Sequence, residues 1–134
     1  MKQIFLLFSH QLTITQQDEL KNSFDVGKFI YLPPELQNIW SNILPELPSI
    51  KNYLQDIFVW LKENSNFQDL VLVQGEFGAV FLTVDFCKKA GLIPIYATAK
   101  RVITEEIVSD QTVQTKRNFT HVRFREFEKW SYRQ

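Results

Sequence analysis

Cysteine and histidine are scarce in this sequence. Among its 134 residues it has one cysteine, Cys87, and two histidines, His10 and His121. A lone cysteine excludes a disulfide within the chain and a multi-cysteine zinc site, and it is typical of the reducing cytoplasm, where we expect this protein. Because these three possible ligands are also far apart in the sequence, we expect no metal centre, and no motif indicates a bound cofactor.

Net charge and long apolar runs are absent as well. The 15 Lys and Arg residues balance the 15 Asp and Glu residues, but residues 81–134 hold 10 basic and 6 acidic side chains, against 5 and 9 in 1–80. This local excess favours an anion site in the C-terminal section over a surface that coats duplex nucleic acid. The longest apolar runs, such as Ile4–Phe8, are too short to span a membrane, so we expect no membrane partner.

The remaining composition is that of a packed globule. Hydrophobic residues make up 45% of the chain and charged residues 22%, which excludes a disordered or collagen-like protein. The 12 phenylalanines can supply a dense core for so short a chain. The length suits one domain, so we expect residues 1–134 to form a single folding unit.

Short unbroken apolar runs alternate with helical patterns along most of the chain. The runs predict strands at Ile4–Phe8, Phe29–Leu32, Leu70–Val73 and Ile93–Ala97. This alternation is typical of an α/β fold with a mostly parallel sheet flanked by helices. Residues 102–108 and 112–127 then predict two further strands around the polar turn Ser109-Asp110-Gln111, so we expect a C-terminal β-hairpin.

Helix signals lie between the predicted strands. Thr15 is a plausible N-cap ahead of acidic residues, Pro34 can open a second helix, and Ser49 can cap a third. A fourth helix is expected from about Phe77 to Ala90, with Gly91 directly after it.

Candidate functional residues follow the strands, because ligands of open parallel sheets bind beyond the carboxyl ends of the strands. The segments at these ends are Ser9-His10, Pro33-Pro34, Gln74-Gly75-Glu76-Phe77-Gly78 and Thr98-Ala99-Lys100-Arg101. All except the proline pair carry groups suited to a phosphate or a ribose.

The turn from Gln74 to Gly78 has two readings. Its glycines permit a close backbone approach, and the following helix directs free N–H groups at an anion. The alternative is a tight turn that needs glycine for geometry alone. Because Glu76 would compete with a phosphate, this turn favours contact with a base or a hydroxyl. Neither a Gly-x-Gly-x-x-Gly fingerprint nor a Walker A sequence is present.

Basic residues form two further candidates. Lys100 and Arg101 follow a predicted strand and could hold one phosphate together, or they belong to a solvated loop. His121, Arg123 and Arg125 alternate along the last strand, which predicts a shared anion-contacting face with Val122 and Phe124 turned to the core. The alternative for this row is an edge strand guarded by charge.

Ser9 and His10 could serve as a phosphate contact and as a general acid or base. The alternatives are a capping serine and a structural histidine. No acidic neighbour completes a catalytic triad, and no Gly-x-Ser-x-Gly elbow is present. We expect Cys87, in the middle of a helix, to be a small core residue.

These strand ends resemble a family of small CRISPR-associated accessory proteins, the Csx series found beside type III systems. The segments that carry the resemblance are Phe5-Leu6-Leu7-Phe8-Ser9-His10, Tyr31-Leu32-Pro33-Pro34-Glu35-Leu36-Gln37 with Trp40-Ser41, Val71-Leu72-Val73-Gln74-Gly75-Glu76-Phe77-Gly78-Ala79, Gly91-Leu92-Ile93-Pro94-Ile95-Tyr96-Ala97-Thr98-Ala99-Lys100-Arg101 and Phe119-Thr120-His121-Val122-Arg123-Phe124-Arg125. Together they span nearly the whole chain.

The resemblance implies a Rossmann-like fold related to sensor domains for cyclic oligoadenylates, and the activity of a ring nuclease that switches off type III signalling. It implies a homodimer, with cyclic tetra-adenylate as the first ligand to test. The expected cleavage is metal-independent attack by a ribose 2′-hydroxyl. Lys100 or Arg101 would stabilise charge, Ser9 would position a phosphate and His10 would handle a proton, while Phe77 or Tyr96 could stack on a base.

Two other functions fit the same residues. A binding protein that holds the ring without cutting it needs the same cations and loops. A different α/β domain that binds an ordinary nucleotide, or that serves as an interaction subunit, is the third hypothesis.

Overall fold

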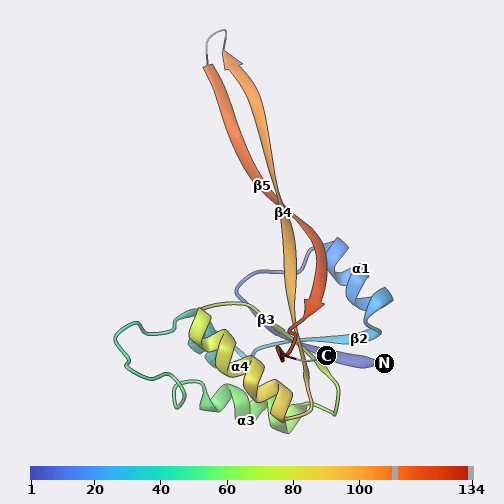
Figure 1. Cartoon of the computed structure of the whole chain (residues 1–134), viewed down its shortest axis with the longest axis vertical. Coiled ribbons are helices and arrows are strands. Elements are labelled where there is room, and N and C mark those ends of the chain that lie inside the picture. The colour runs from blue at the N-terminus through green and yellow to red at the C-terminus, as the bar shows by residue number, and fades with distance from the viewer. Residues whose placement is uncertain (110–111, 133–134) are drawn as a thin grey trace.

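The computed structural model describes residues 1–109 and 112–132, which form a five-stranded sheet with helices on both faces and a long two-stranded projection (Figure 1). The strands are β1 (Lys2–Leu7), β2 (Val26–Tyr31), β3 (Leu70–Val73), β4 (Ile93–Ser109) and β5 (Thr112–Glu126). Their spatial order is β2-β1-β3-β4-β5, with β5 antiparallel to β4 and the other neighbours parallel. The prediction of an α/β fold with a mostly parallel sheet and a C-terminal strand pair is confirmed.

Two layers of helices cover the sheet. The helices are α1 (Ile14–Ser23), α2 (Pro34–Ser41), α3 (Gln55–Asn64) and α4 (Phe77–Lys89). Alternate residues of β1 enter different clusters: Phe5 packs with core residues of α2, α3 and α4, whereas Leu6 packs with Leu20 of α1. A strand buried on both faces needs apolar residues at every position, which explains the unbroken runs in the sequence.

Two of the predicted helix starts are wrong. Thr13, not Thr15, caps α1: its hydroxyl accepts from the Gln16 backbone N–H, and the Gln16 side chain accepts from the Thr13 N–H. This reciprocal capping box satisfies two backbone donors at once, which outweighs the single bond that a cap at Thr15 would offer. The third helix, α3, begins only at Gln55, after a turn, so Ser49 is not its cap.

The other helix boundaries agree with the predictions. Pro34 is the first residue of α2, and α4 runs from Phe77 to Lys89 with Ala90 as its C-cap. Gly91 follows at φ +77°, and a Cβ there would lie 2.7 Å from the ring of Phe67. Only glycine fits that position without strain. Cys87 is fully buried in α4, and burial raises the pKa of its thiol to about 12, so it is an unreactive core residue.

The segment from Thr98 to Arg101 is not a loop. The two strands predicted at Ile93–Ala97 and at residues 102–108 are one strand, β4, paired along almost its full length with β5. The antiparallel partner satisfies the backbone of these polar residues, so nothing ends the strand there. The predicted turn residues Asp110 and Gln111 lie outside the described residues.

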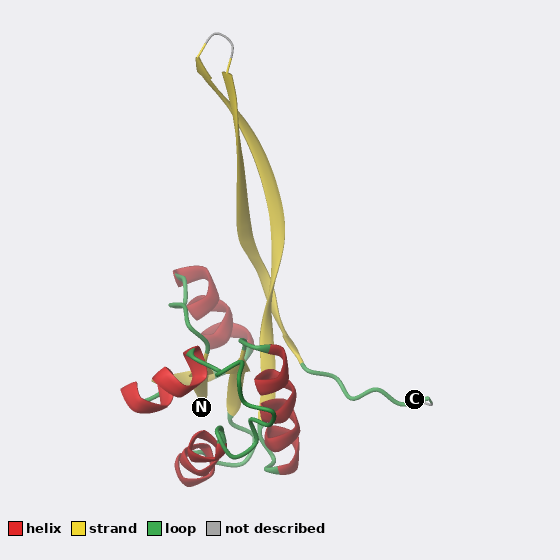
Figure 2. Ribbon diagram, turned by 90° about the vertical axis from the view of Figure 1, so that its left-hand side faces the viewer, coloured by secondary structure: helices red, strands yellow, loops and turns green. Residues whose placement is uncertain are grey.

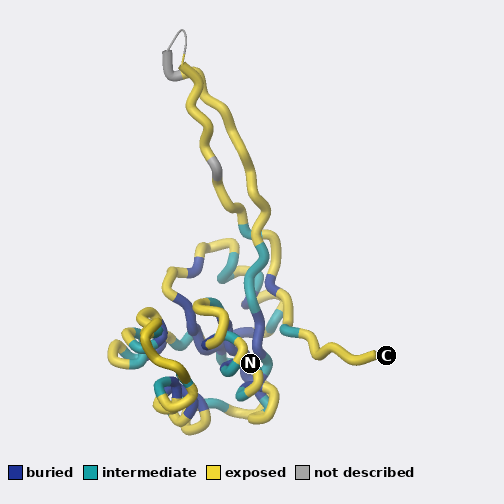
Figure 3. The backbone as a smooth tube through the Cα atoms, turned by 60° about the vertical axis from the view of Figure 1, so that its left-hand side comes forward, coloured by how far each residue is buried: buried dark blue, intermediate teal, exposed yellow. Residues whose placement is uncertain are grey.

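Residues 99–109 and 112–121 form the part of this strand pair that leaves the sheet, which we call the arm. Figure 2 shows it projecting from the body, on the side where the parallel strands end. Its residues are exposed wherever their burial is described, except at its base (Figure 3). Within the described residues, no helix is long and apolar enough to cross a membrane.

Candidate functional site

The strand order changes direction between β1 and β3. From this pair, β2 lies on one side and β4 on the other. Ser9 follows β1 and Gln74 follows β3, and the Gln74 N–H donates to the carbonyl of Leu7 at 3.0 Å. Such a place is a topological switch point, and in open α/β sheets ligands bind in the crevice beside it, beyond the carboxyl ends of the strands. The structure therefore brings together two of the predicted segments, those after β1 and β3.

Helix α2 adds polar groups to this place. The Ser9 hydroxyl lies 2.9 Å from that of Ser41, and the Gln37 side chain donates to the Ser41 hydroxyl at 2.8 Å and to the Phe8 carbonyl at 3.2 Å. Gln37 and Ser41 are not among the site residues predicted from the sequence. Their i, i+4 spacing on the helix that begins at Pro34 indicated that the two side chains are neighbours on one face of that helix. We call Ser9, Gln37, Ser41, Gln74 and Gly75 the carboxyl-edge site.

Gln74 is held from both sides. Its carbonyl accepts from the indole N–H of Trp40 at 2.9 Å, and its side-chain oxygen accepts from the N–H of Ala97 on β4 at 3.0 Å. A Cβ at Gly75 would lie 3.1 Å from the Trp40 indole nitrogen. Gly75 therefore permits a close approach to a buried ring, which supports the geometric reading of this turn.

Glu76 occupies the start of α4 itself. Its carboxylate caps the helix by accepting from the Ala79 N–H at 2.8 Å, and a Cβ at Gly78 would lie 3.1 Å from the same oxygen. A carboxylate at this position already uses the helix N-terminus that a phosphate would need. Phe77, the first residue of α4, is 94% exposed and follows the Gln74–Gly75 turn by two residues.

Lys100 and Arg101 lie within β4 and point to opposite faces of the arm, because successive strand residues alternate. One phosphate between them does not fit this geometry. Lys100 is on the face of Tyr96, whose ring contacts Phe127 in the cluster of α2, α3 and α4. Lys100 lies about 10 Å further along β4 than Ala97, because each of the three residues between their Cα atoms advances the strand by about 3.3 Å. Lys100 is thus on the side of the carboxyl-edge site, a face that it shares with Arg123 and Arg125, the partners of Thr98 and Tyr96 on β5.

His121 does not share a face with Arg123 and Arg125. A bulge pairs Thr98 with Arg123 but Ala99 with His121, so Val122 is an extra residue on β5. The slip turns the His121 ring toward Phe124, with ring centroids 4.7 Å apart, and leaves Val122 57% exposed. The predictions of one basic row and of a buried Val122 are wrong, because strict alternation ends at a bulge.

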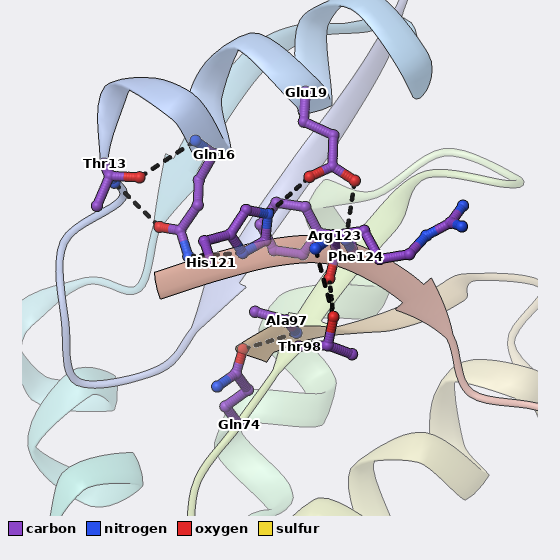
Figure 4. A network of polar contacts seen from close by, with 9 residues as sticks. All are labelled: Thr13, Gln16, Glu19, Gln74, Ala97, Thr98, His121, Arg123 and Phe124. Atoms are coloured by element: carbon purple, nitrogen blue, oxygen red, sulfur yellow. Dashed lines mark hydrogen bonds and ion pairs between the residues drawn. The ribbon is translucent and has the colours of Figure 1, made fainter. Parts of the chain in front are cut away.

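A polar network locks His121 and the base of the arm to α1 (Figure 4). Glu19 accepts at one oxygen from the His121 ring, 2.6 Å away, and at the other from the Phe124 N–H, at 2.8 Å. The amide of Gln16 lies 3.4 Å from the other ring nitrogen of His121. Across β4, the Thr98 hydroxyl donates to the Arg123 carbonyl. His121 and Thr98 are therefore structural residues here.

Glu19→Ala should lower the free energy of unfolding by about 3 kcal/mol, because it leaves the His121 ring and the Phe124 N–H without their buried acceptor. Urea denaturation followed by circular dichroism measures the change. Asp18→Ala, an exposed neighbour on the same helix, is the control and should stay within about 0.5 kcal/mol of the wild type. Equal effects of the two substitutions would contradict the role of this network.

His10 and Ser9 diverge, as adjacent residues at a strand end do. The His10 ring contacts Phe8, at 6.4 Å between centroids, and Phe8 belongs to the cluster on the α1 side. Ser9 instead contacts Ser41 of α2. Within residues 1–109 and 112–132, no three His, Cys, Asp or Glu side chains are placed to hold a metal ion.

A family model described as the uncharacterized protein MJ1673 family matches residues 2–125. The chain belongs to this family. It is 46% identical over 127 residues to a Methanocaldococcus jannaschii protein named "Uncharacterized protein MJ1673", a match that covers 95% of this chain and 98% of the relative. No solved structure matches the chain.

The match of the MJ1673 family spans the whole carboxyl-edge site and the base of the arm. Of the predicted site residues, Ser9, Gln74 and Gly75 meet at one place, with Glu76, Phe77 and Gly78 beside it and Lys100 above it. His10 and His121 lie toward α1, while Arg123 and Arg125 are exposed on β5.

Proposed function

We propose that this MJ1673-family chain has a Rossmann-like fold and is a ring nuclease of type III CRISPR defence, which binds a cyclic oligoadenylate at the carboxyl-edge site and cleaves it. The supporting observation is the meeting of Ser9 and Gln74 where the strand order changes direction, with Lys100 on the same side of the sheet. Cyclic tetra-adenylate is the first ligand to test. The cytoplasmic location and the homodimer remain predictions.

The polar groups suit such a ring. Phosphates attract a cation and hydroxyl donors, which Lys100, Ser9 and Ser41 supply, and ribose hydroxyls can bond to the amide of Gln37. An unpaired adenine stacks on an exposed aromatic ring, and Phe77 offers one.

The proposed cleavage uses the ring's own hydroxyl. A ribose 2′-oxygen attacks the neighbouring phosphorus, and the bond from phosphorus to the 5′-oxygen breaks, which leaves a 2′,3′-cyclic phosphate and a 5′-hydroxyl. The 2′-hydroxyl proton passes to water, and the leaving oxygen takes a proton from water, because the His10 ring packs against Phe8 on the other side. Ser9 would orient the phosphate, and Lys100 would stabilise the charge that develops on it.

Incubating the purified protein with labelled cyclic tetra-adenylate in EDTA tests the proposal. Linear product that exceeds the amount of protein supports the ring nuclease. Ligand that is bound and recovered intact after denaturation supports the second candidate, a binding protein that does not cut. That candidate is favoured by one observation: both histidines of the described residues are directed away from the carboxyl-edge site. A thermal shift with ATP or NAD but not with the ring would contradict both.

Phe77→Ala should weaken binding of cyclic tetra-adenylate about tenfold, because stacking of one base contributes about 1–3 kcal/mol. Calorimetry or fluorescence titration measures the affinity. Phe81→Ala is the matched control, since Phe81 is an exposed phenylalanine one turn further along α4. Neither variant should lose stability, and an unchanged affinity for Phe77→Ala would remove the stacking contact.

A further inference from the structure

One face of the strand pair β4–β5 carries most of its charges with the same sign. Because paired residues of antiparallel strands point to the same side, the register assigns the side chains of this face. We call it the basic face, and its exposed members are Lys100, Val102, Thr104 and Glu106 of β4 with Gln114, Lys116, Asn118, Thr120, Arg123 and Arg125 of β5. Among these side chains four are cations, and Glu106 is the one anion.

The cations of the basic face form a row along the ribbon. The register places Arg125, Arg123 and Lys100 at steps of two residues. Lys116 lies four residues beyond Lys100, opposite Thr104. A step of two residues is about 6.6 Å along a strand, so the row is about 26 Å long. This step is close to the separation of successive phosphates along an extended polynucleotide, so the row can follow one such strand.

Nearby acidic side chains leave this row available to a ligand. Lys116 pairs with Glu106 at 3.2 Å, but both side chains are about half exposed, and an ion pair this exposed is weak. Glu126 and Glu128 line a hollow together with Arg123 and Arg125. Within residues 1–109 and 112–132, no ion pair joins these four side chains. A phosphate can therefore compete for each cation of the row.

Hydroxyl and amide groups lie between the cations. Thr104, Asn118 and Thr120 are all exposed on the basic face. Their side chains can donate to a phosphate oxygen and can also accept from a ribose 2′-hydroxyl, the group that distinguishes RNA from DNA. Charges that only guard an exposed ribbon against aggregation can be of either sign. The common sign and the interleaved hydroxyls therefore favour an RNA ligand over simple solvation.

We propose that the basic face binds single-stranded RNA of any sequence, through its phosphates and ribose hydroxyls. The ribbon stands clear of the helices beyond its base, so a strand can lie along it (Figure 2). The row can contact only one polynucleotide strand, because the ribbon is two β-strands wide and these are about 5 Å apart. This feature favours a single strand over a duplex.

This function does not depend on cleavage of the cyclic ligand. The row continues about 13 Å beyond Lys100, to Lys116, in the direction away from the carboxyl-edge site. Loss of Lys116 should weaken the binding of linear RNA and leave cleavage of the ring unchanged. RNA affinity therefore tests the arm, whereas turnover of the ring tests the carboxyl-edge site.

A pair of neighbouring substitutions tests which face binds. Fluorescence anisotropy with a labelled RNA of about 12 nucleotides, a length typical of single-strand sites, measures the affinity. Val102→Glu places a carboxylate between Lys100 and Lys116 and should weaken binding about tenfold or more. Ile103→Glu makes the same change of charge on the opposite face, so its affinity should stay within about twofold of the wild type. Both replaced side chains are exposed, so neither change should unfold the protein.

The salt dependence of the affinity counts the phosphate contacts. Four contacts predict a slope of about −3 for the logarithm of the affinity against the logarithm of the salt concentration, at about −0.7 for each contact. Lys116→Ala should change this slope to about −2. Arg101→Ala removes a cation from the opposite face and is the control, with an unchanged slope.

Three outcomes would overturn the proposal. The first is a wild-type protein that does not bind the RNA even at low salt. The second is an equal effect of Val102→Glu and Ile103→Glu, which would place the RNA elsewhere on the molecule. The third is equal or tighter binding of single-stranded DNA or of duplex RNA with the same sequence, because the 2′-hydroxyl contacts and the single row predict weaker binding of both.

Discussion

Lys100→Ala should slow the cleavage of cyclic tetra-adenylate about 100-fold, because in the proposed mechanism Lys100 stabilises the charge that develops on the reacting phosphate. Lys100 lies on the α2, α3 and α4 side of β4, above Gln74. The effect should fall mainly on kcat, since the negative charge on the phosphate oxygens grows in the transition state. Single-turnover rates with labelled ring, measured in EDTA, give the comparison.

Two variants make this result specific. Lys116 pairs with Thr104, four residues beyond Lys100 on β4, and lies on the same face of the arm. The Lys116→Ala variant should therefore cleave the ring at the wild-type rate. Arg101→Ala should cost less than Lys100→Ala, because Arg101 points to the opposite face. A Lys100→Ala, Arg101→Ala double variant with unchanged cutting would remove both cations from the mechanism.

Trp40→Ala should lower the free energy of unfolding by about 3–5 kcal/mol, the usual cost of deleting a large buried aromatic side chain. Trp40 is 2% exposed and fills the space between α2 and the Gln74–Gly75 turn. Its indole N–H also satisfies the Gln74 carbonyl. Urea denaturation of the purified variant measures the loss.

Trp40→Phe separates packing from hydrogen bonding. Phenylalanine keeps most of the apolar volume but leaves the Gln74 carbonyl without its donor, so we expect a loss of about 1–2 kcal/mol. The Gln74–Gly75 turn loses this hydrogen bond, so we also expect a lower affinity for cyclic tetra-adenylate, even where the variant is fully folded. If Trp40→Ala costs less than about 1 kcal/mol, the turn is not supported by this residue.

Local patterns in the sequence were sufficient to predict the strands in the core of the sheet. The strand Leu70–Val73 was predicted with the bounds that the structure has, because a parallel strand buried on both faces is apolar at every position. Pro34 and Phe77 marked the starts of α2 and α4 for equally local reasons. The grouping of Ser9 with Gln74 followed from the rule that parallel strands end at one edge.

Local patterns in the sequence did not predict the structure of the arm and its base. The sequence around Thr98 and Arg101 is polar, which favoured a loop, yet β5 pairs with it and extends β4 to Ser109. The bulge at Val122 turned His121 from an expected ligand contact into a buried partner of Glu19. Neither feature has a signal in nearby residues, because both depend on register against a distant strand.

By itself, the sequence determined the class of fold, the strands of the parallel core and the edge at which these strands end, where we propose a ligand site. These follow from burial and periodicity, which each segment carries on its own. Tertiary structure alone decided that Lys100 and Arg101 face apart, that Gln37 and Ser41 join Ser9, and that Lys100 shares a face with Arg123 and Arg125. Those outcomes depend on pairing between residues far apart in the chain, which no single segment encodes.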